Sequence, residues 1–200
     1  MHVVLYIHGQ GGSAAEAEHY RPLFPSCAVR GLDYQGRTPW EVGAELKEAV
    51  EALRAAYDGV ILIANSIGAF YAMHARIEAE ITRAYFISPI VDMEALIADM
   101  MVRANVTEAE LQDRGTIQTA FGAELSWAYL SYVRSNPLRW TVPTDILYGS
   151  LDTMTSRETI TAFARAHHAS LTVMEGGEHW FHTPEQLRFL DAWLTEHAGN

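Results

Sequence analysis

Short apolar runs alternate with helix-like patterns along most of this 200-residue chain. The apolar runs predict buried strands, because each is too short for a helix and ends at glycine, proline or polar turn residues. Between them, apolar side chains recur every three or four positions, which predicts amphipathic helices. The expected strands are residues 3–7, 27–32, 60–64, 81–87, 144–148 and 170–174, and the expected helices are 40–57, 66–79, 156–166 and 184–196.

This alternation predicts an α/β fold in which a mostly parallel six-stranded sheet has helices on both faces. Residues 90–140 break the rhythm and are rich in methionine and aromatic residues. We expect them to form two or three helices of a small cap, inserted into a single domain that spans residues 1–200. In parallel sheets of this kind, functional residues lie on the loops at the carboxyl ends of the strands.

Charge and cysteine content narrow the possible functions. Lys and Arg number 14 and Asp and Glu 25, giving a net charge of −11, with Lys47 the only lysine. A nucleic-acid or anionic-membrane partner is not expected, because both require a basic surface. No apolar run approaches the roughly 18 residues of a membrane span, and no signal peptide is recognisable. We therefore expect a soluble, cytoplasmic protein. Cys27 is the only cysteine, which excludes an intramolecular disulfide and a Cys-rich metal site, and no other cluster has the spacing of metal ligands. No cofactor is expected.

The end of the third strand carries the clearest chemical motif, residues 63–69, Ile-Ala-Asn-Ser-Ile-Gly-Ala. A strand that turns sharply into a helix at a serine needs small neighbours, which Ala64 and Gly68 provide. The pattern is A-x-S-x-G, a variant of the G-x-S-x-G nucleophile elbow that exposes the serine hydroxyl. The alternative interpretation is that Ser66 is an ordinary helix N-cap.

A serine nucleophile needs a base that is held in place by a third group. Asp152 follows the strand 144–148, and His179 follows the last strand. Each residue alone is weak evidence, but both stand at strand ends, and the order Ser, Asp, His along the chain is that of α/β-hydrolases. We therefore predict a triad of Ser66, His179 and Asp152.

Five motifs together resemble the α/β-hydrolase superfamily, and specifically its small single-domain serine hydrolases. They are HGQGGS (8–13), LDYQGRT (32–38), ANSIGA (64–69), GSLD (149–152) and GGEHWF (176–181). The resemblance covers most of the chain except 90–140, and Ala64 departs from the glycine that is commonest in the elbow. It implies hydrolysis through an acyl-enzyme, with the backbone N–H groups of Gln10 and Ile67 as oxyanion hole. Some related enzymes place the triad acid at the position of Asp92, which stays an alternative to Asp152.

The expected substrate is a small-molecule ester or thioester with a neutral or apolar acyl group. Its contacts are expected from Met100, Trp127, Tyr129 and Trp180, although the cap side chains could equally form the cap's own core. One alternative is a non-catalytic binding or regulatory protein on the same fold. A second is a dinucleotide-binding protein that uses GQGGSA (9–14) and Asp33. That reading is disfavoured because it leaves the three triad residues without a role.

Overall fold

The computed structural model describes residues 1–198, which fall into two compact units. The larger unit consists of Met1–Val91 together with the chain from Arg139 onward, and the smaller unit is Asp92–Leu138. The interruption of the strand–helix alternation, expected at 90–140, therefore coincides closely with a separate structural unit.

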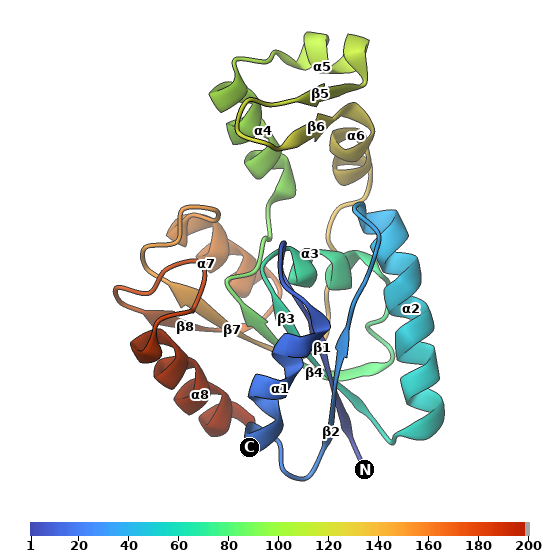
Figure 1. Cartoon of the computed structure of the whole chain (residues 1–200), viewed down its shortest axis with the longest axis vertical. Helices are drawn as coiled ribbons and strands as arrows, with labels where there is room; N and C mark the ends of the chain where they lie inside the picture. Colours follow the sequence, from blue (N-terminus) through green and yellow to red (C-terminus); the bar gives the residue numbers. More distant parts are fainter. Residues whose placement is uncertain (199–200) are drawn as a thin grey trace. The chain divides into compact units, whose positions relative to one another are not determined.

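The larger unit is built on a six-stranded parallel sheet of order β2-β1-β3-β4-β7-β8 (Figure 1). This confirms the predicted sheet. Its strands are β1 (Val3–Ile7), β2 (Ala28–Leu32), β3 (Val60–Asn65), β4 (Ile81–Ile87), β7 (Thr144–Gly149) and β8 (Ser170–Met174).

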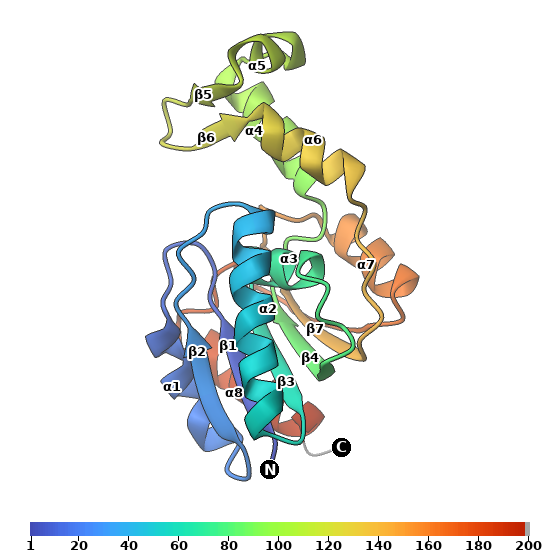
Figure 2. The ribbon, with the colours of Figure 1, turned by 90° about the vertical axis from the view of Figure 1, so that its right-hand side faces the viewer.

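Helices cover both faces of this sheet, with α1 and α8 on one face and α2, α3 and α7 on the other (Figure 2). The α-helices are α1 (Ala17–Tyr20), α2 (Pro39–Ala56), α3 (Ile67–His74), α7 (Arg157–Ala166) and α8 (Pro184–Ala198), and the 3₁₀ turns are η1 (Ala14–Glu16) and η2 (Arg21–Leu23). On the first face, Tyr20 of α1 and Trp193 of α8 are buried in one cluster with Tyr85 of β4. Burial of such aromatic side chains is a main source of stability for the sheet.

Local sequence explains where the helices begin and end. Thr38 accepts a hydrogen bond from the Glu41 backbone N–H, and Pro39 occupies the first turn of α2, where its missing N–H costs nothing. The third helix is shorter than the expected 66–79. It ends at His74, because Arg76 adopts a left-handed backbone conformation with φ 55° that no helix accommodates.

Strand register brings the functional loops to one edge of the sheet. Ile7 at the end of β1 pairs with Ala64 of β3, and Asn65 pairs with Ile87 at the end of β4. Ile87 in turn pairs with Leu147 of β7. Because all six strands are parallel, the loops that follow them emerge at the same edge.

The smaller unit contains a two-stranded antiparallel hairpin in addition to its helices. The sequence had predicted only helices here, so the hairpin is a correction. It forms because Ile117 and Leu125 pair across the hairpin and are both buried, with Gly122 at φ 83° in the connecting turn. The elements of this unit are α4 (Met93–Ala104), α5 (Glu108–Arg114), β5 (Thr116–Gln118), β6 (Glu124–Ser126) and α6 (Trp127–Ser135).

Among residues 1–198, the structure contains no helix that is long and apolar enough to cross a membrane.

Candidate active site

Ser66 sits at the turn between β3 and α3 in a strained backbone conformation, with φ 52° and ψ −120°. A non-glycine residue is held there only when the surrounding structure enforces it. Two backbone hydrogen bonds to the segment at the end of β4 enforce it. The Ser66 N–H donates to the Ile87 carbonyl (2.9 Å), and the Ile90 N–H donates to the Ser66 carbonyl (3.2 Å). Ser66 therefore lies at the tip of a sharp strand-to-helix turn, the geometry predicted for an elbow, and does not cap α3 with its side chain.

Small residues make this sharp turn possible. A Cβ atom on Gly68 would lie 2.6 Å from the His8 carbonyl oxygen, so only glycine fits where α3 passes the loop after β1. A Cβ atom on Gly9 would come within 3.2 Å of the Ser66 Cβ. Ala64 is completely buried and pairs with Ile7 of β1. The structure thus accommodates alanine at the position where the elbow motif usually has glycine.

The three predicted triad side chains form one hydrogen-bonded chain. Ser66 Oγ lies 2.8 Å from His179 Nε2, and His179 Nδ1 lies 2.7 Å from Asp152 Oδ2. Because an ionised carboxylate only accepts hydrogen bonds, this contact places the imidazole proton on Nδ1 and leaves Nε2 free to accept the proton of the serine.

The Asp152 carboxylate is removed from water and fully paired. Its side chain is 0% exposed. Besides the bond to His179, its Oδ1 accepts hydrogen bonds from the backbone N–H groups of Met154 (2.7 Å) and Thr155 (3.1 Å). A buried carboxylate is tolerated only with such partners, and here they also fix its orientation toward the histidine.

The loops that carry Asp152 and His179 are joined through their backbones. The Leu151 N–H donates to the Gly177 carbonyl, and the Gly176 N–H donates to Ser150 Oγ, both at 2.8 Å. A Cβ atom on Gly149 would lie 2.5 Å from the Gly177 carbonyl oxygen, so the two loops approach as closely as glycine allows. The loops of Asp152 and His179 are therefore positioned as one structure.

The loop after β1 passes beside Ser66 and is held by aromatic and acidic side chains. Tyr34 stacks on the His8 ring at 4.2 Å and donates a hydrogen bond to the His8 carbonyl. Glu16 accepts hydrogen bonds from the Ser13 N–H and the Tyr6 hydroxyl. Burial is the main cause that raises the pKa of Tyr6, so this hydroxyl stays a donor. Gln10 is exposed at the turn of this loop.

Ile67 is the first residue of α3, where a backbone N–H has no acceptor within its own helix. Asp33, the acidic residue of the dinucleotide interpretation, accepts a hydrogen bond from the Ala14 N–H at 2.6 Å. The segment after GQGGSA forms only short helical turns, not the long helix whose N-terminus would hold a pyrophosphate.

No protein-family model matches the chain, and no curated protein matches its sequence. Solved structures do resemble it. Est1E from Butyrivibrio proteoclasticus has a TM-score of 0.76 at 17% identity, covering 98% of this chain and 86% of that one. Mouse alpha/beta hydrolase domain-containing protein 10 has a TM-score of 0.73 at 16% identity, covering 98% and 89%. The thioesterase domain from the curacin biosynthetic pathway has a TM-score of 0.60 at 16% identity, covering 96% and 90%.

The chain has the α/β-hydrolase fold.

Within this α/β-hydrolase fold, the other predicted site residues occupy different places. Asp92, the alternative acid, accepts a hydrogen bond from the Ala95 N–H at 2.9 Å and so caps α4. Trp180, next to His179, is 67% exposed and stacks on the His182 ring. The remaining three residues belong to the smaller unit: Met100 is on α4, and Trp127 and Tyr129 are on α6.

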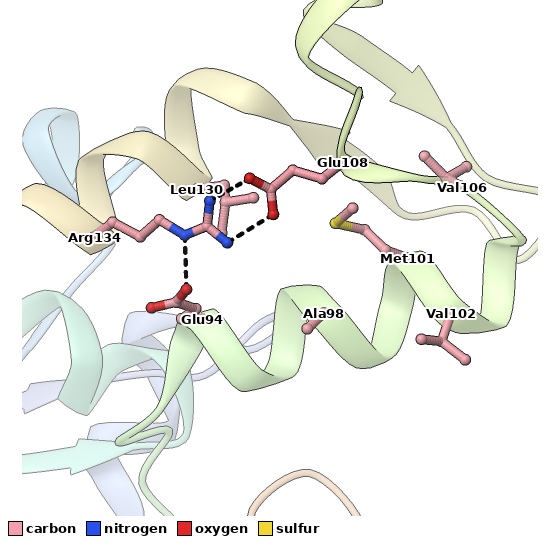
Figure 3. A pocket seen from close by; sticks show the side chains of 8 residues that line it. All are labelled: Glu94, Ala98, Met101, Val102, Val106, Glu108, Leu130 and Arg134. Atoms are coloured by element: carbon pink, nitrogen blue, oxygen red, sulfur yellow. Dashed lines mark hydrogen bonds and ion pairs between the residues drawn. The ribbon is translucent and has the colours of Figure 1, made fainter. Parts of the chain in front are cut away.

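The smaller unit has a pocket of its own, of about 210 Å³ (Figure 3). Its apolar lining is Ala98, Met101, Val102, Val106 and Leu130. On one side Arg134 forms ion pairs with Glu94 and Glu108. Because these two carboxylates already occupy the guanidinium, and the volume is below the roughly 300 Å³ of typical ligand sites, we assign no ligand to it.

Among the described residues, no group of three or more His, Cys, Asp or Glu side chains is placed to hold a metal ion. One residue of the site was not predicted from the sequence: Gln186, a buried polar side chain beside the loop of His179. Its only sequence signal is the spacing Thr183-x-x-Gln186, which resembles a capping box at the start of α8.

Proposed function

We propose that this chain is a serine hydrolase that cleaves an ester or thioester of a small, neutral or apolar acyl group. The observation that carries the proposal is the continuous hydrogen-bonded chain from Ser66 Oγ through His179 to the buried Asp152. Three side chains from three separate loops meet in the geometry that nucleophilic catalysis requires.

In the proposed reaction, Ser66 Oγ attacks the substrate carbonyl while His179 Nε2 takes its proton. The N–H groups of Gln10 and Ile67 stabilise the negative charge that develops on the carbonyl oxygen. His179 then gives the proton to the leaving alcohol or thiol, which departs and leaves an acyl group on Ser66. Water, deprotonated by the same histidine, hydrolyses this acyl-enzyme. Throughout, Asp152 holds the imidazole and stabilises its positive charge.

Structural neighbours support an acyl substrate without defining it. Est1E has been solved with ferulic acid bound, and the curacin-pathway neighbour is a thioesterase domain. We propose that the exposed Trp180 contacts the substrate beside His179. We further propose that the smaller unit acts as a cap whose Met100, Trp127 and Tyr129 contact the acyl group.

The decisive experiment combines a fluorophosphonate probe with ester hydrolysis. The wild-type protein should be labelled at Ser66, located by peptide mass spectrometry, and should hydrolyse short p-nitrophenyl and feruloyl esters. Ser66→Ala should lose both activities with an unchanged melting temperature. Ser156→Ala is the matched control, because Ser156 caps α7 on the surface and should leave both intact. Labelling at another serine, or turnover by Ser66→Ala, would contradict the proposal.

A second pair of variants tests the acid. Asp152→Asn should lower turnover by about 10⁴, because the amide favours the wrong histidine tautomer. Asp92→Asn should keep normal turnover, since that carboxylate caps α4. If Asp92→Asn were the damaging change, the acid would have to be reassigned. A wild-type protein that neither labels nor hydrolyses any ester would favour the non-catalytic alternative.

A further inference from the structure

The first half of the loop that carries His179 is held by hydrogen bonds to the loop of Asp152. Those contacts involve Gly176 and Gly177, before the histidine. After the histidine, the chain runs through Trp180 to the start of α8 at Pro184. Phe181 anchors this second half in the core of the larger unit. Since a displacement of about 1 Å at a catalytic group can cost 10²-fold in rate, any further contact that fixes the loop around His179 matters for catalysis.

Gln186 on the first turn of α8 spans the loop from both sides of His179. Its side chain is buried, with the residue 5% exposed. Its Oε1 accepts a hydrogen bond from the His182 backbone N–H at 3.2 Å, and its Nε2 donates one to Glu178 Oε2 at 3.3 Å. One amide group therefore connects the residue just before the histidine with a residue just after it.

We propose that Gln186 is a positioning residue for catalysis, which clamps residues 178–182 so that the His179 ring stays aligned between Ser66 and Asp152. The inference rests on the proposed function, because it assigns Gln186 a role in that reaction. Gln186 does not contact the nucleophile or the reacting atoms itself. It acts through the loop that carries the base.

The simpler interpretation is that Gln186 only caps α8. Thr183 Oγ1 accepts a hydrogen bond from the Gln186 N–H, and glutamine three residues after such a threonine is typical of a capping box. Glutamate serves equally well at that position. A cap, however, does not need the second hydrogen bond to Glu178, and this bond separates the two interpretations experimentally.

The first test is Gln186→Met, which keeps the side-chain length and removes both hydrogen bonds. With a p-nitrophenyl ester, kcat should fall by about 10- to 100-fold while KM changes by less than about twofold, because the variant misaligns the base and leaves substrate binding unaffected. A purely capping residue would lower the melting temperature and leave kcat of the folded protein unchanged. That result would overturn the proposal.

The second test exchanges donor and acceptor. Gln186→Glu retains the cap and the acceptor for the His182 N–H, but turns a carboxylate toward Glu178, so kcat should again fall. Adding Glu178→Gln to this variant restores a donor–acceptor pair, and kcat should return to within about threefold of wild type. If Gln186→Glu alone had wild-type kcat, the bond to Glu178 would have no role and the proposal would fail.

A readout that does not depend on activity separates this inference from the proposed function. In wild-type protein, the His179 Nδ1 proton bonded to Asp152 should give a downfield NMR resonance, identified by its loss in Asp152→Asn. Gln186→Met should broaden or abolish this resonance and speed hydrogen exchange at the His182 amide. An unchanged resonance would refute the positioning role, whether or not the protein hydrolyses esters. Failure of probe labelling at Ser66 would instead refute the proposed function.

Discussion

At the scale of single residues, the site depends on places where backbones approach too closely for a side chain. Gly149 at the end of β7 faces the Gly177 carbonyl oxygen, which a Cβ atom would approach to 2.5 Å. The three nearest atoms, the Gly177 carbonyl carbon and oxygen and the Glu178 carbonyl oxygen, all belong to the backbone, so they cannot rotate away as a flexible side chain would. The contact lies between the loops of Asp152 and His179, and any relief must move one loop relative to the other.

We therefore expect Gly149→Ala to lower both stability and activity. Overpacking of this kind typically costs about 1–3 kcal/mol, and separation of the two loops should reduce kcat more than it raises KM. Gly43→Ala in α2 is the matched control. Its Cβ would lie 3.5 Å from the Ala75 Cα, an ordinary contact. It should increase stability by about 0.5–1 kcal/mol and leave kcat unchanged. Urea unfolding and ester kinetics measure both quantities, and a neutral Gly149→Ala would show that the loops are free to separate.

At the scale of secondary-structure elements, the sequence predicts the larger unit well because each strand and helix has its own clear periodicity. The elements of the smaller unit are harder to predict from the sequence. Its two strands have three residues each, too few for an alternating pattern, and Ile117 and Leu125 become buried only when the hairpin pairs and packs against the helices of this unit. The helix expected over 66–79 also ends early. Ile77 is buried, but it follows the left-handed residue Arg76 and lies outside the helix.

In the candidate site, too, only the residues that are tied to a clear hydrophobic pattern could be predicted. Ser66, Asp152 and His179 could be predicted because they follow strands, and strand ends can be located from hydrophobic patterns. Gln186 could not, because its role depends on the path of an irregular loop between β8 and α8. Its hydrogen bonds to residues 178 and 182 arise from that path and leave no periodic signal.

Three helices of the smaller unit are connected by one arginine. Arg134 on α6 donates to Glu94 on α4 and makes a two-pronged contact with Glu108, the first residue of α5. The hydrogen bond from Arg134 is the main cause that lowers the pKa of Glu108. Because the pKa of Glu108 is lower in the folded than in the unfolded state, its ion pair with Arg134 stabilises the folded state. This stabilisation is present above the usual glutamate pKa of about 4.3 and is lost as the pH falls below it.

Accordingly, Arg134→Met should weaken the smaller unit at neutral pH and have progressively less effect in acid. Hydrogen exchange at the β5 and β6 amides should be faster in the variant than in wild type at about pH 7, and the ratio of the two rates should approach one as the pH falls through the lowered pKa of Glu108. Lys47→Met removes an exposed ion pair with Glu51 on α2 and should change nothing measurable. A ratio that stays constant with pH would mean that Arg134 acts through packing alone.

At the scale of the whole molecule, the site exists only when distant parts of the chain are assembled. Ser66 and His179 are 113 residues apart in sequence, and four strands of the sheet, β3, β4, β7 and β8, must be in register before their loops meet. The same assembled molecule has a net charge of −11 with a single lysine. Its summed field therefore acts on every substrate that approaches, independently of the contacts made at Ser66.

This field predicts discrimination against acidic substrates. A p-nitrophenyl ester whose acyl chain ends in a carboxylate should have a severalfold lower kcat/KM than its uncharged counterpart at low ionic strength. The ratio of charged to uncharged kcat/KM should rise with added salt, because the screening length falls from about 30 Å at 0.01 M to about 3 Å at 1 M. The uncharged ester controls for effects of salt on the enzyme itself. A ratio that is independent of salt would place the discrimination in direct contacts within the site, and a preference for the charged ester at low salt would indicate a local positive region that outweighs the overall charge.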